Sequence, residues 1–235
     1  MIPTTLPTSP PLAVGLPRWT LPTKVESVTG ELLDSEGRID CLVNNAGYGQ
    51  EGAIEDVPVD SVRSQFDVNV FGVLRVTRAV LPAMRAQNAG TVVNVSSLLG
   101  RIAYPMRGVY AGSKFAIEGI SDALRRELAG FGVDVVLVEP GTVDTKFDER
   151  ASETTVEIDT ESSPYSRGYT LVGGAQRLFS KFGIAPDSVA KTIRRAATAD
   201  HPSRRYVVGL DAKVLLALRY LPTRLQDWIF SKAVR

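Results

Sequence analysis

A tyrosine and a lysine lie four residues apart in the segment Tyr110-Ala111-Gly112-Ser113-Lys114. If this segment is helical, residues four apart share one face, which brings the ammonium group close to the phenol. A nearby positive charge favours the phenolate and lowers the pKa of a tyrosine. A phenol with a reference pKa of about 10 then becomes an acid–base group that works near neutral pH. Such a pair also arises by chance, so only its position relative to other motifs can indicate a catalytic role.

Small, hydroxyl and amide residues follow three short apolar runs of the chain, and these runs predict buried strands. The runs and the residues after them are Ile39–Val43 with residues 44–49, Thr91–Val95 with residues 96–97, and Val133–Val138 with residues 139–145. In open α/β sheets, ligands bind beyond the carboxyl ends of the strands. We therefore expect these residues to converge on one rim, where a serine hydroxyl can hold the oxygen that reacts with Tyr110.

Asn69 is a polar residue on the apolar stripe of a predicted helix, three residues after Phe66 and four before Val73. A buried amide must find hydrogen-bond partners, often backbone groups or ordered water. Two interpretations stay open at this point. Asn69 is either an asparagine that bends its helix within the core, or a relay that positions a water behind the lysine.

The elements that must position these residues alternate along the chain. The three apolar runs, and a weaker fourth at Arg205–Val208, lack clean alternation of apolar and polar residues, which is typical of parallel strands covered on both faces. Helical periodicity fills the intervals. The predicted helices cover residues 24–36, 59–84, 108–129, 187–199, 211–220 and 221–232. Strands and helices in alternation predict an α/β fold with a doubly wound parallel sheet.

The composition excludes several classes of protein. The 235 residues carry a net charge of +1, which argues against a nucleic-acid binder. No run of 18 apolar residues is present, so no integral membrane segment is expected. The single cysteine, Cys41, excludes a disulfide framework and a multi-cysteine zinc site. The single histidine, His201, argues against a histidine-based triad, and no metal site is expected.

Three segments depart from the regular pattern. Residues 1–23 hold six of the 14 prolines and predict an irregular, partly polyproline segment. The remaining residues, 24–235, form one predicted domain. Residues 144–175 show little apolar periodicity, which predicts a loop that is either an active-site lid or disordered. Residues 211–232 carry an apolar stripe that packs on the domain, roofs a lipophilic pocket or touches a membrane surface.

In combination, several of these motifs resemble those of the short-chain dehydrogenases/reductases, the large Rossmann-fold family of NAD(P)-dependent oxidoreductases. The motifs are Asn44-Asn45-Ala46-Gly47, Asn69, Ser97, Tyr110 with Lys114, and Pro140-Gly141 with Thr145. The resemblance runs from about Glu26 to the C-terminus. The segment 109–145 is most similar to the branch that acts on hydroxysteroids, retinoids and other lipophilic alcohols.

The resemblance implies a role for each matching residue. Tyr110 is the implied general acid/base, and Lys114 lowers its pKa and bonds the nicotinamide ribose. Ser97 polarises the substrate oxygen, and Asn69 completes a proton relay. The implied cofactor, NAD or NADP, is bordered by Asn45, Ala46 and Gly47 on its adenosine side and by Pro140, Gly141, Val143 and Thr145 at the nicotinamide. The family further implies a small lipophilic alcohol or ketone as substrate, a cytoplasmic location, and a homodimer or homotetramer formed through the helices 59–84 and 108–129.

One family motif has no counterpart in the sequence. Family members begin with a βαβ unit whose Thr-Gly-x-x-x-Gly-x-Gly loop holds the pyrophosphate, whereas here Gly15 is the only glycine before Gly30. We therefore expect an N-terminally incomplete Rossmann-like domain with an open sheet edge at strand 39–43. Two functions follow: an oxidoreductase of lipophilic alcohols and ketones or aldehydes, or a cofactor-less remnant that acts as a binding module. An in-frame glycine-rich segment in the upstream DNA would decide for the first.

The missing loop gives a direct prediction about cofactor affinity. We expect this chain of 235 residues to bind NADH and NADPH weakly or not at all, because the backbone amides that hold the pyrophosphate belong to the missing unit. Calorimetric titration measures this, and a micromolar dissociation constant for either nucleotide would contradict it.

Overall fold

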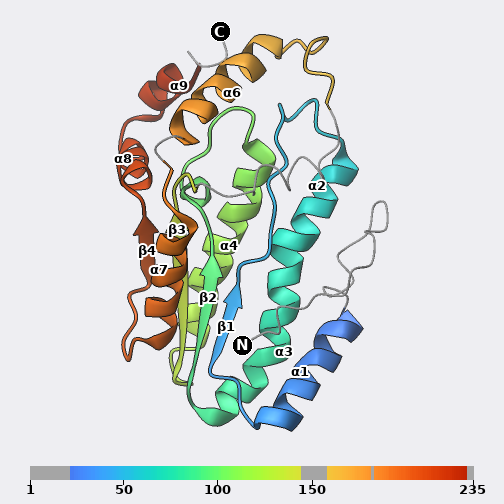
Figure 1. Ribbon diagram of the computed structural model, residues 1–235, viewed down its shortest axis with the longest axis vertical. Coiled ribbons are helices and arrows are strands. Elements are labelled where there is room, and N and C mark those ends of the chain that lie inside the picture. Colours follow the sequence, from blue (N-terminus) through green and yellow to red (C-terminus); the bar gives the residue numbers. More distant parts are fainter. Residues whose placement is uncertain (1–21, 144–157, 181–182, 232–235) are drawn as a thin grey trace.

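The four apolar runs form one parallel sheet in the computed structural model, which describes residues 22–143, 158–180 and 183–231. Its strands, in order across the sheet, are β1 (Cys41–Asn44), β2 (Gly90–Val95), β3 (Val133–Pro140) and β4 (Arg205–Val208). In the register, Leu42 pairs with Val92 and Val92 with Val135. The predicted α/β fold is confirmed, and the carboxyl ends of the parallel strands meet at one edge of the sheet (Figure 1).

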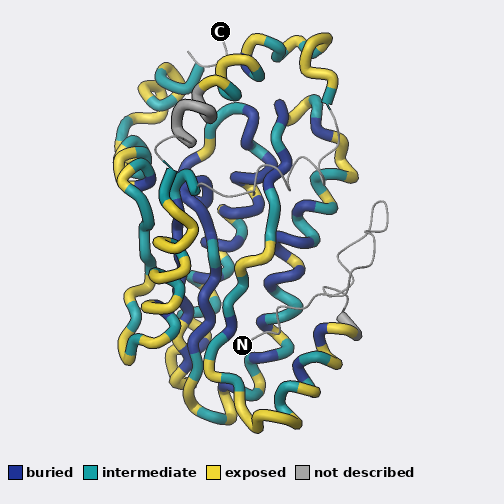
Figure 2. The backbone as a smooth tube through the Cα atoms, viewed as in Figure 1, coloured by how far each residue is buried: buried dark blue, intermediate teal, exposed yellow. Residues whose placement is uncertain are grey.

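Helices cover both faces of this sheet (Figure 1). On one face, α3 (Val73–Gln87) and α4 (Gly108–Glu127) pack against the strands around the fully buried Met84. On the other face, α7 (Pro186–Thr198) places Ala196 against β2 and β3. The remaining helices are α1 (Pro22–Glu36), which lies against α3, and α2 (Val59–Phe66), α6 (Ser166–Ser180), α8 (Leu210–Leu218) and α9 (Thr223–Ser231). Figure 2 shows that the buried residues concentrate along the strands and the inner sides of α3 and α4.

The predicted helix at residues 59–84 is divided in the structure. After α2 ends, a π-helical segment covers Asp67–Gly72, and α3 follows it without a break. A π-helical turn is a local widening of an α-helix and is frequent at functional sites. Asn69 lies in this turn and is 1% exposed. The prediction of one continuous α-helix is therefore wrong at the turn that carries a candidate site residue.

The N-terminal helix agrees closely with its prediction. α1 starts at Pro22, two residues before the predicted start, because proline is compatible with the first turn of a helix. Gly37 follows the helix with φ +71°, a left-handed conformation that glycine adopts without strain. Residues 1–21 of the proline-rich segment lie outside the described residues, so its predicted irregularity stays a prediction.

The predicted loop at residues 144–175 contains helical structure. Residues 144–157 lie outside the described part of the chain, whereas α6 occupies 166–180. The prediction of an irregular segment is therefore wrong from residue 166 onward. The Tyr169 hydroxyl accepts a hydrogen bond from the Ala53 amide, 116 residues away in the sequence, at 2.9 Å, and donates one to Asp56 Oδ2 at 2.8 Å. Such contacts support a helix that local periodicity does not reveal.

Four further expectations can be compared with the described residues. Within them, β1 pairs with β2 alone, and no helix is long and apolar enough to cross a membrane. No group of histidine, cysteine, aspartate or glutamate side chains in those ranges could hold a metal ion. The C-terminal stripe packs partly on the domain, since Leu215 and Leu218 of α8 lie against the buried cluster that contains Leu98, Leu99 and Ile102. Other members of the stripe, such as Val214 and Trp228, are more than half exposed.

Because β3 lies in the core, truncation of one of its buried side chains should strongly lower the stability of the fold. Leu137 is 0% exposed and packs with Val73 and Ile117, so Leu137→Ala should lower the free energy of unfolding by about 2–5 kcal/mol. Leu210, which is 76% exposed, provides the matched control, and Leu210→Ala should change it by less than about 0.5 kcal/mol. Denaturant unfolding of both variants measures the difference, and equal losses would contradict the assignment of the core.

Candidate active site

Tyr110 and Lys114 lie in the first turns of α4, as their spacing predicted. Tyr110 is 8% exposed and Lys114 7%. The Lys114 ammonium donates a hydrogen bond to the carbonyl oxygen of Val95, at the carboxyl end of β2, at 2.8 Å. The same nitrogen lies 5.7 Å from the centre of the Tyr110 ring. The structure thus brings the helical pair to the strand end that the sequence placed beside it.

Burial changes the acid–base properties of this lysine. Removal of the ammonium from water lowers the pKa of Lys114 from its ordinary 10.5 to about 8, while the charge of Glu118 opposes this change. With a pKa near 8, Lys114 is still mostly protonated at neutral pH. A cation beside a phenol favours the phenolate, which is the electrostatic arrangement that proton transfer by Tyr110 requires.

The amide of Asn69 connects the end of β1 with α4. Its Nδ2 donates to the Tyr48 carbonyl oxygen at 2.8 Å and to Ser113 Oγ at 3.1 Å, and its Oδ1 accepts from the Tyr48 amide at 3.1 Å. Ser113 in turn donates to the Tyr110 carbonyl oxygen at 2.8 Å. Asn69 therefore uses both amide hydrogens and its oxygen to fix the backbone after β1 against the helix that carries Tyr110.

The two serines after β2 lie in different surroundings. Ser97 precedes a 3-10 turn at Leu98–Gly100, and its Oγ accepts a hydrogen bond from the Leu99 amide at 3.1 Å. Ser96 is buried, and a Cβ placed on Gly100 would lie 2.6 Å from Ser96 Oγ and 3.0 Å from Glu118 Cγ. Ser97, the residue implied by the resemblance, thus lies at the strand end, and Ser96 belongs to the interior behind Lys114.

Residues after β3 are held by a carboxylate that the sequence analysis did not select. The Thr142 amide donates to Asp211 Oδ2 at 2.6 Å, and the Gly141 amide donates to the Val208 carbonyl oxygen at 2.9 Å. A Cβ on Gly141 would lie within 2.5 Å of the Asp211 carboxylate, so this close approach requires glycine. The only local signal for Asp211 is an acidic residue in the first turn of a helix, which is common for electrostatic reasons alone.

The other candidate residues within the described ranges lie at the same edge of the sheet. Asn45 and Ala46 are exposed directly after β1. Gly47 packs closely on Asn69, since a Cβ there would lie 2.9 Å from Asn69 Oδ1. Pro140 ends β3, and Val143 forms a parallel bridge with Ile184. Thr145 lies outside the described residues.

Besides Asp211, three further polar residues of the site were missed by sequence reasoning: Ser113, Gln65 and Glu118. Gln65 donates to Ser113 Oγ at 3.3 Å and accepts from the Gln50 amide at 2.5 Å. Each of them looks like an ordinary polar helical residue in the sequence. Their roles depend on which partners face them across the fold, and no spacing within one helix contains that information.

The chain is similar to proteins of one family. The model of the family described as "short chain dehydrogenase" matches residues 19–156. The NADPH-dependent 3-dehydrocapnine reductase of Ornithobacterium rhinotracheale is 38% identical over 200 residues, which cover 83% of this chain and 70% of the reductase. Across the curated relatives that it matches, the chain spans between 63% and 75% of their length.

Two solved structures share the fold. A short-chain dehydrogenase from Streptomyces avermitilis is 31% identical, with a TM-score of 0.74 over 94% of this chain and 77% of that one. A short chain dehydrogenase/reductase from Burkholderia phymatum, in complex with NAD, is 26% identical, with a TM-score of 0.70 over 90% and 74% of the two chains. The range 19–156 matched by the family model includes Asn69, Tyr110 and Lys114.

The lowered pKa of Lys114 predicts a pH dependence of stability. Between about pH 8 and 10.5 the unfolded chain holds a proton on Lys114 that the folded chain has lost, so stability rises with pH. The unfolding free energy of wild type relative to Lys114→Met should rise between pH 8 and 10 at up to about 1.4 kcal/mol per pH unit. The exposed Lys213 gives the control, since Lys213→Met should leave the slope unchanged. Parallel curves for wild type and Lys114→Met would contradict the prediction.

Proposed function

The chain belongs to the short-chain dehydrogenases, a family of oxidoreductases, and we propose that it interconverts a lipophilic secondary alcohol and a ketone, or an alcohol and an aldehyde, with NAD or NADP. The observation that carries this proposal is the buried Lys114 ammonium, held on the Val95 carbonyl oxygen beside the Tyr110 ring. A cation held next to a phenol stabilises the phenolate, and this favours proton transfer between the phenol and a substrate oxygen.

Each residue then has a defined task. In reduction, Tyr110 gives its proton to the carbonyl oxygen of the substrate, and in oxidation it takes the proton of the alcohol. Lys114 stabilises the phenolate form, and the Ser97 hydroxyl holds the reacting oxygen. Asn69 keeps the strand end and α4 in register through Tyr48 and Ser113, which places it behind the proton path rather than in contact with the substrate.

Residues at the carboxyl edge of the sheet are assigned to the two sides of the dinucleotide. Asn45, Ala46 and Gly47, which follow β1, border its adenosine side in this proposal. Pro140 at the end of β3, with Gly141 and Val143 after it, lines the nicotinamide. Thr145 completes this set in the proposal. When bound, the nicotinamide supplies or accepts the hydride, and the protein contributes orientation and proton transfer.

Apolar surroundings of Tyr110 support a lipophilic substrate. Leu98, Leu99 and Ile102 are buried in one cluster with Tyr110, and Leu215 and Leu218 of α8 pack against that cluster. The relative from Ornithobacterium is named as a reductase that uses NADPH, which supports NADP and the reductive direction. The exposed Phe71 and Phe115, 49% and 43% accessible, support a homodimer or homotetramer formed through the π-helical segment and α4.

Substitution of Tyr110 tests the proposed function. The chain is assayed with millimolar NADPH or NADH against a panel of lipophilic ketones and aldehydes, because weak cofactor binding is expected. Tyr110→Phe should reduce turnover by about 10²- to 10⁴-fold, the usual contribution of a positioned acid–base group. Tyr220→Phe is the matched control, because Tyr220 is 85% exposed, and it should retain activity. Unchanged turnover in a folded Tyr110→Phe protein would remove Tyr110 from its role.

A further inference from the structure

We propose that Glu118 is a positioning residue of the candidate site: its carboxylate, kept ionised by Arg205, keeps the ammonium of Lys114 charged beside Tyr110. This inference deepens the proposed function and rests on it for its biological meaning. The effect of the Glu118 charge on the protonation of Lys114, and through Lys114 on Tyr110, can be measured without a cofactor or a substrate.

The first argument is the spacing along α4. Tyr110, Lys114 and Glu118 follow one another at four-residue intervals, so they share one face of the helix. All three are buried, with Glu118 at 6% exposure. The hydrogen bond of the ammonium to Val95 is to a neutral carbonyl group, so the countercharge that supports the protonated form must come from elsewhere. Glu118 is the charged group that acts on Lys114 in this way.

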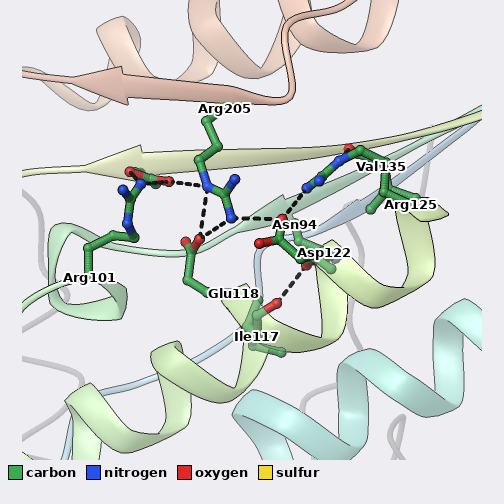
Figure 3. A network of polar contacts seen from close by, with 10 residues as sticks. Asn94, Arg101, Ile117, Glu118, Asp122, Arg125, Val135 and Arg205 are labelled. Atoms are coloured by element: carbon green, nitrogen blue, oxygen red, sulfur yellow. Dashed lines mark hydrogen bonds and ion pairs between the residues drawn. The ribbon is translucent and has the colours of Figure 1, made fainter.

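The second argument is the support that Glu118 receives from Arg205 of β4 (Figure 3). Arg205 Nη2 and Nε donate to Glu118 Oε2 at 3.1 and 3.2 Å. The same guanidinium donates to Asp122 Oδ1 at 2.8 Å and pairs with Glu139 Oε1 at 3.0 Å. A residue of the last strand thus fixes the carboxylate that follows Lys114 on α4.

The charges of this network balance, which allows Glu118 to stay ionised. The three carboxylates are Glu118, Asp122 and Glu139, and the three guanidiniums that pair with them are Arg101, Arg125 and Arg205. Arg101 holds the fully buried Glu139 from a second side, and Arg125 holds Asp122. Because each of those carboxylates has a guanidinium of its own, the charge of Arg205 is available to Glu118.

The third argument is the free oxygen of this carboxylate. Within the described residues, Glu118 Oε1 is buried and makes no hydrogen bond, and the same holds for the hydroxyl of the neighbouring Ser96. Burial raises the pKa of Glu118 and the charge of Glu139 raises it further, whereas the charge of Arg205 lowers it. A partly unpaired charge in an interior of low dielectric acts strongly on its neighbours. Lys114, one helical turn away, is such a neighbour.

Asp122 offers a control for a purely structural role. It contacts the same Arg205 nitrogen as Glu118, but it lies eight residues from Lys114, two turns along the helix. If the network only joins β4 to α4, Glu118→Gln and Asp122→Asn should have similar consequences. If Glu118 supports the charge of Lys114, only Glu118→Gln should change the ionisation of the Lys114–Tyr110 pair.

The test is an NMR titration of Lys114 in chain that carries carbon-13 at the lysine Cε positions, with the Lys114 signal assigned by its loss in Lys114→Met. Glu118→Gln should move the Lys114 midpoint to lower pH by about one unit, because removal of a nearby negative charge disfavours the ammonium. Glu118→Asp, which keeps the charge, should restore most of the wild-type midpoint, and Asp122→Asn should leave the midpoint in place. An unchanged midpoint in Glu118→Gln, or an equal shift in Asp122→Asn, would overturn the proposal.

A second measurement covers the case in which Glu118→Gln does not fold. In wild-type chain carrying carbon-13 at the lysine Cε and glutamate Cδ positions, NMR should show Lys114 and Glu118 both charged at pH 7. A neutral Glu118 or a neutral Lys114 at that pH would overturn the proposal. Neither measurement involves NAD(P) or a ketone, so a chain that shows the expected ionisation but no turnover refutes the proposed function and leaves the role of Glu118 standing.

Discussion

The charged amine that α4 buries against the end of β2 limits how the rest of the molecule can be built. An ammonium group removed from water loses much of its solvation, and a buried lysine without partners gives up its proton. Here the Val95 carbonyl oxygen and the Glu118 carboxylate replace part of that solvation. Both depend on fixed relations between distant elements. The carbonyl oxygen requires that α4 begin just beyond β2, and the carboxylate requires Arg205 of β4.

The strands follow from the sequence because burial on both faces leaves a direct trace in composition. Val92, Val93, Val136 and Val138 are all nearly inaccessible, and a run of such residues is difficult to place anywhere but in a covered sheet. Gly37 likewise marked the end of a helix by a property of its own backbone. The π-helical turn and α6 have no comparable signal in the sequence, because contacts with distant parts of the chain support them. For α6, one such contact is the hydrogen bond that the Tyr169 hydroxyl donates to Asp56.

The candidate site divides in the same way. Tyr110 and Lys114 could be paired from spacing alone, since one helix holds both. Asn69 stood out as a polar residue on an apolar stripe, but its partners Tyr48 and Ser113 come from two other segments. Asp211 was invisible as a site residue, because its carboxylate acts on the backbone of residues 69 positions earlier in the chain. Sequence patterns therefore find groups that share an element and miss the groups that join elements.

The π-helical turn at Asp67–Gly72 makes the site sensitive to the deletion or insertion of a single residue within that turn. A π-helical turn contains one residue more than the α-helical path between the same ends. Each residue of an α-helix turns the chain by about 100° around its axis. Loss of one residue here would therefore rotate α2 relative to α3 rather than simply shorten the helix, and Gln65 would turn away from Ser113. Substitutions at this turn alter a side chain, but a one-residue deletion or insertion changes the direction of every side chain on α2.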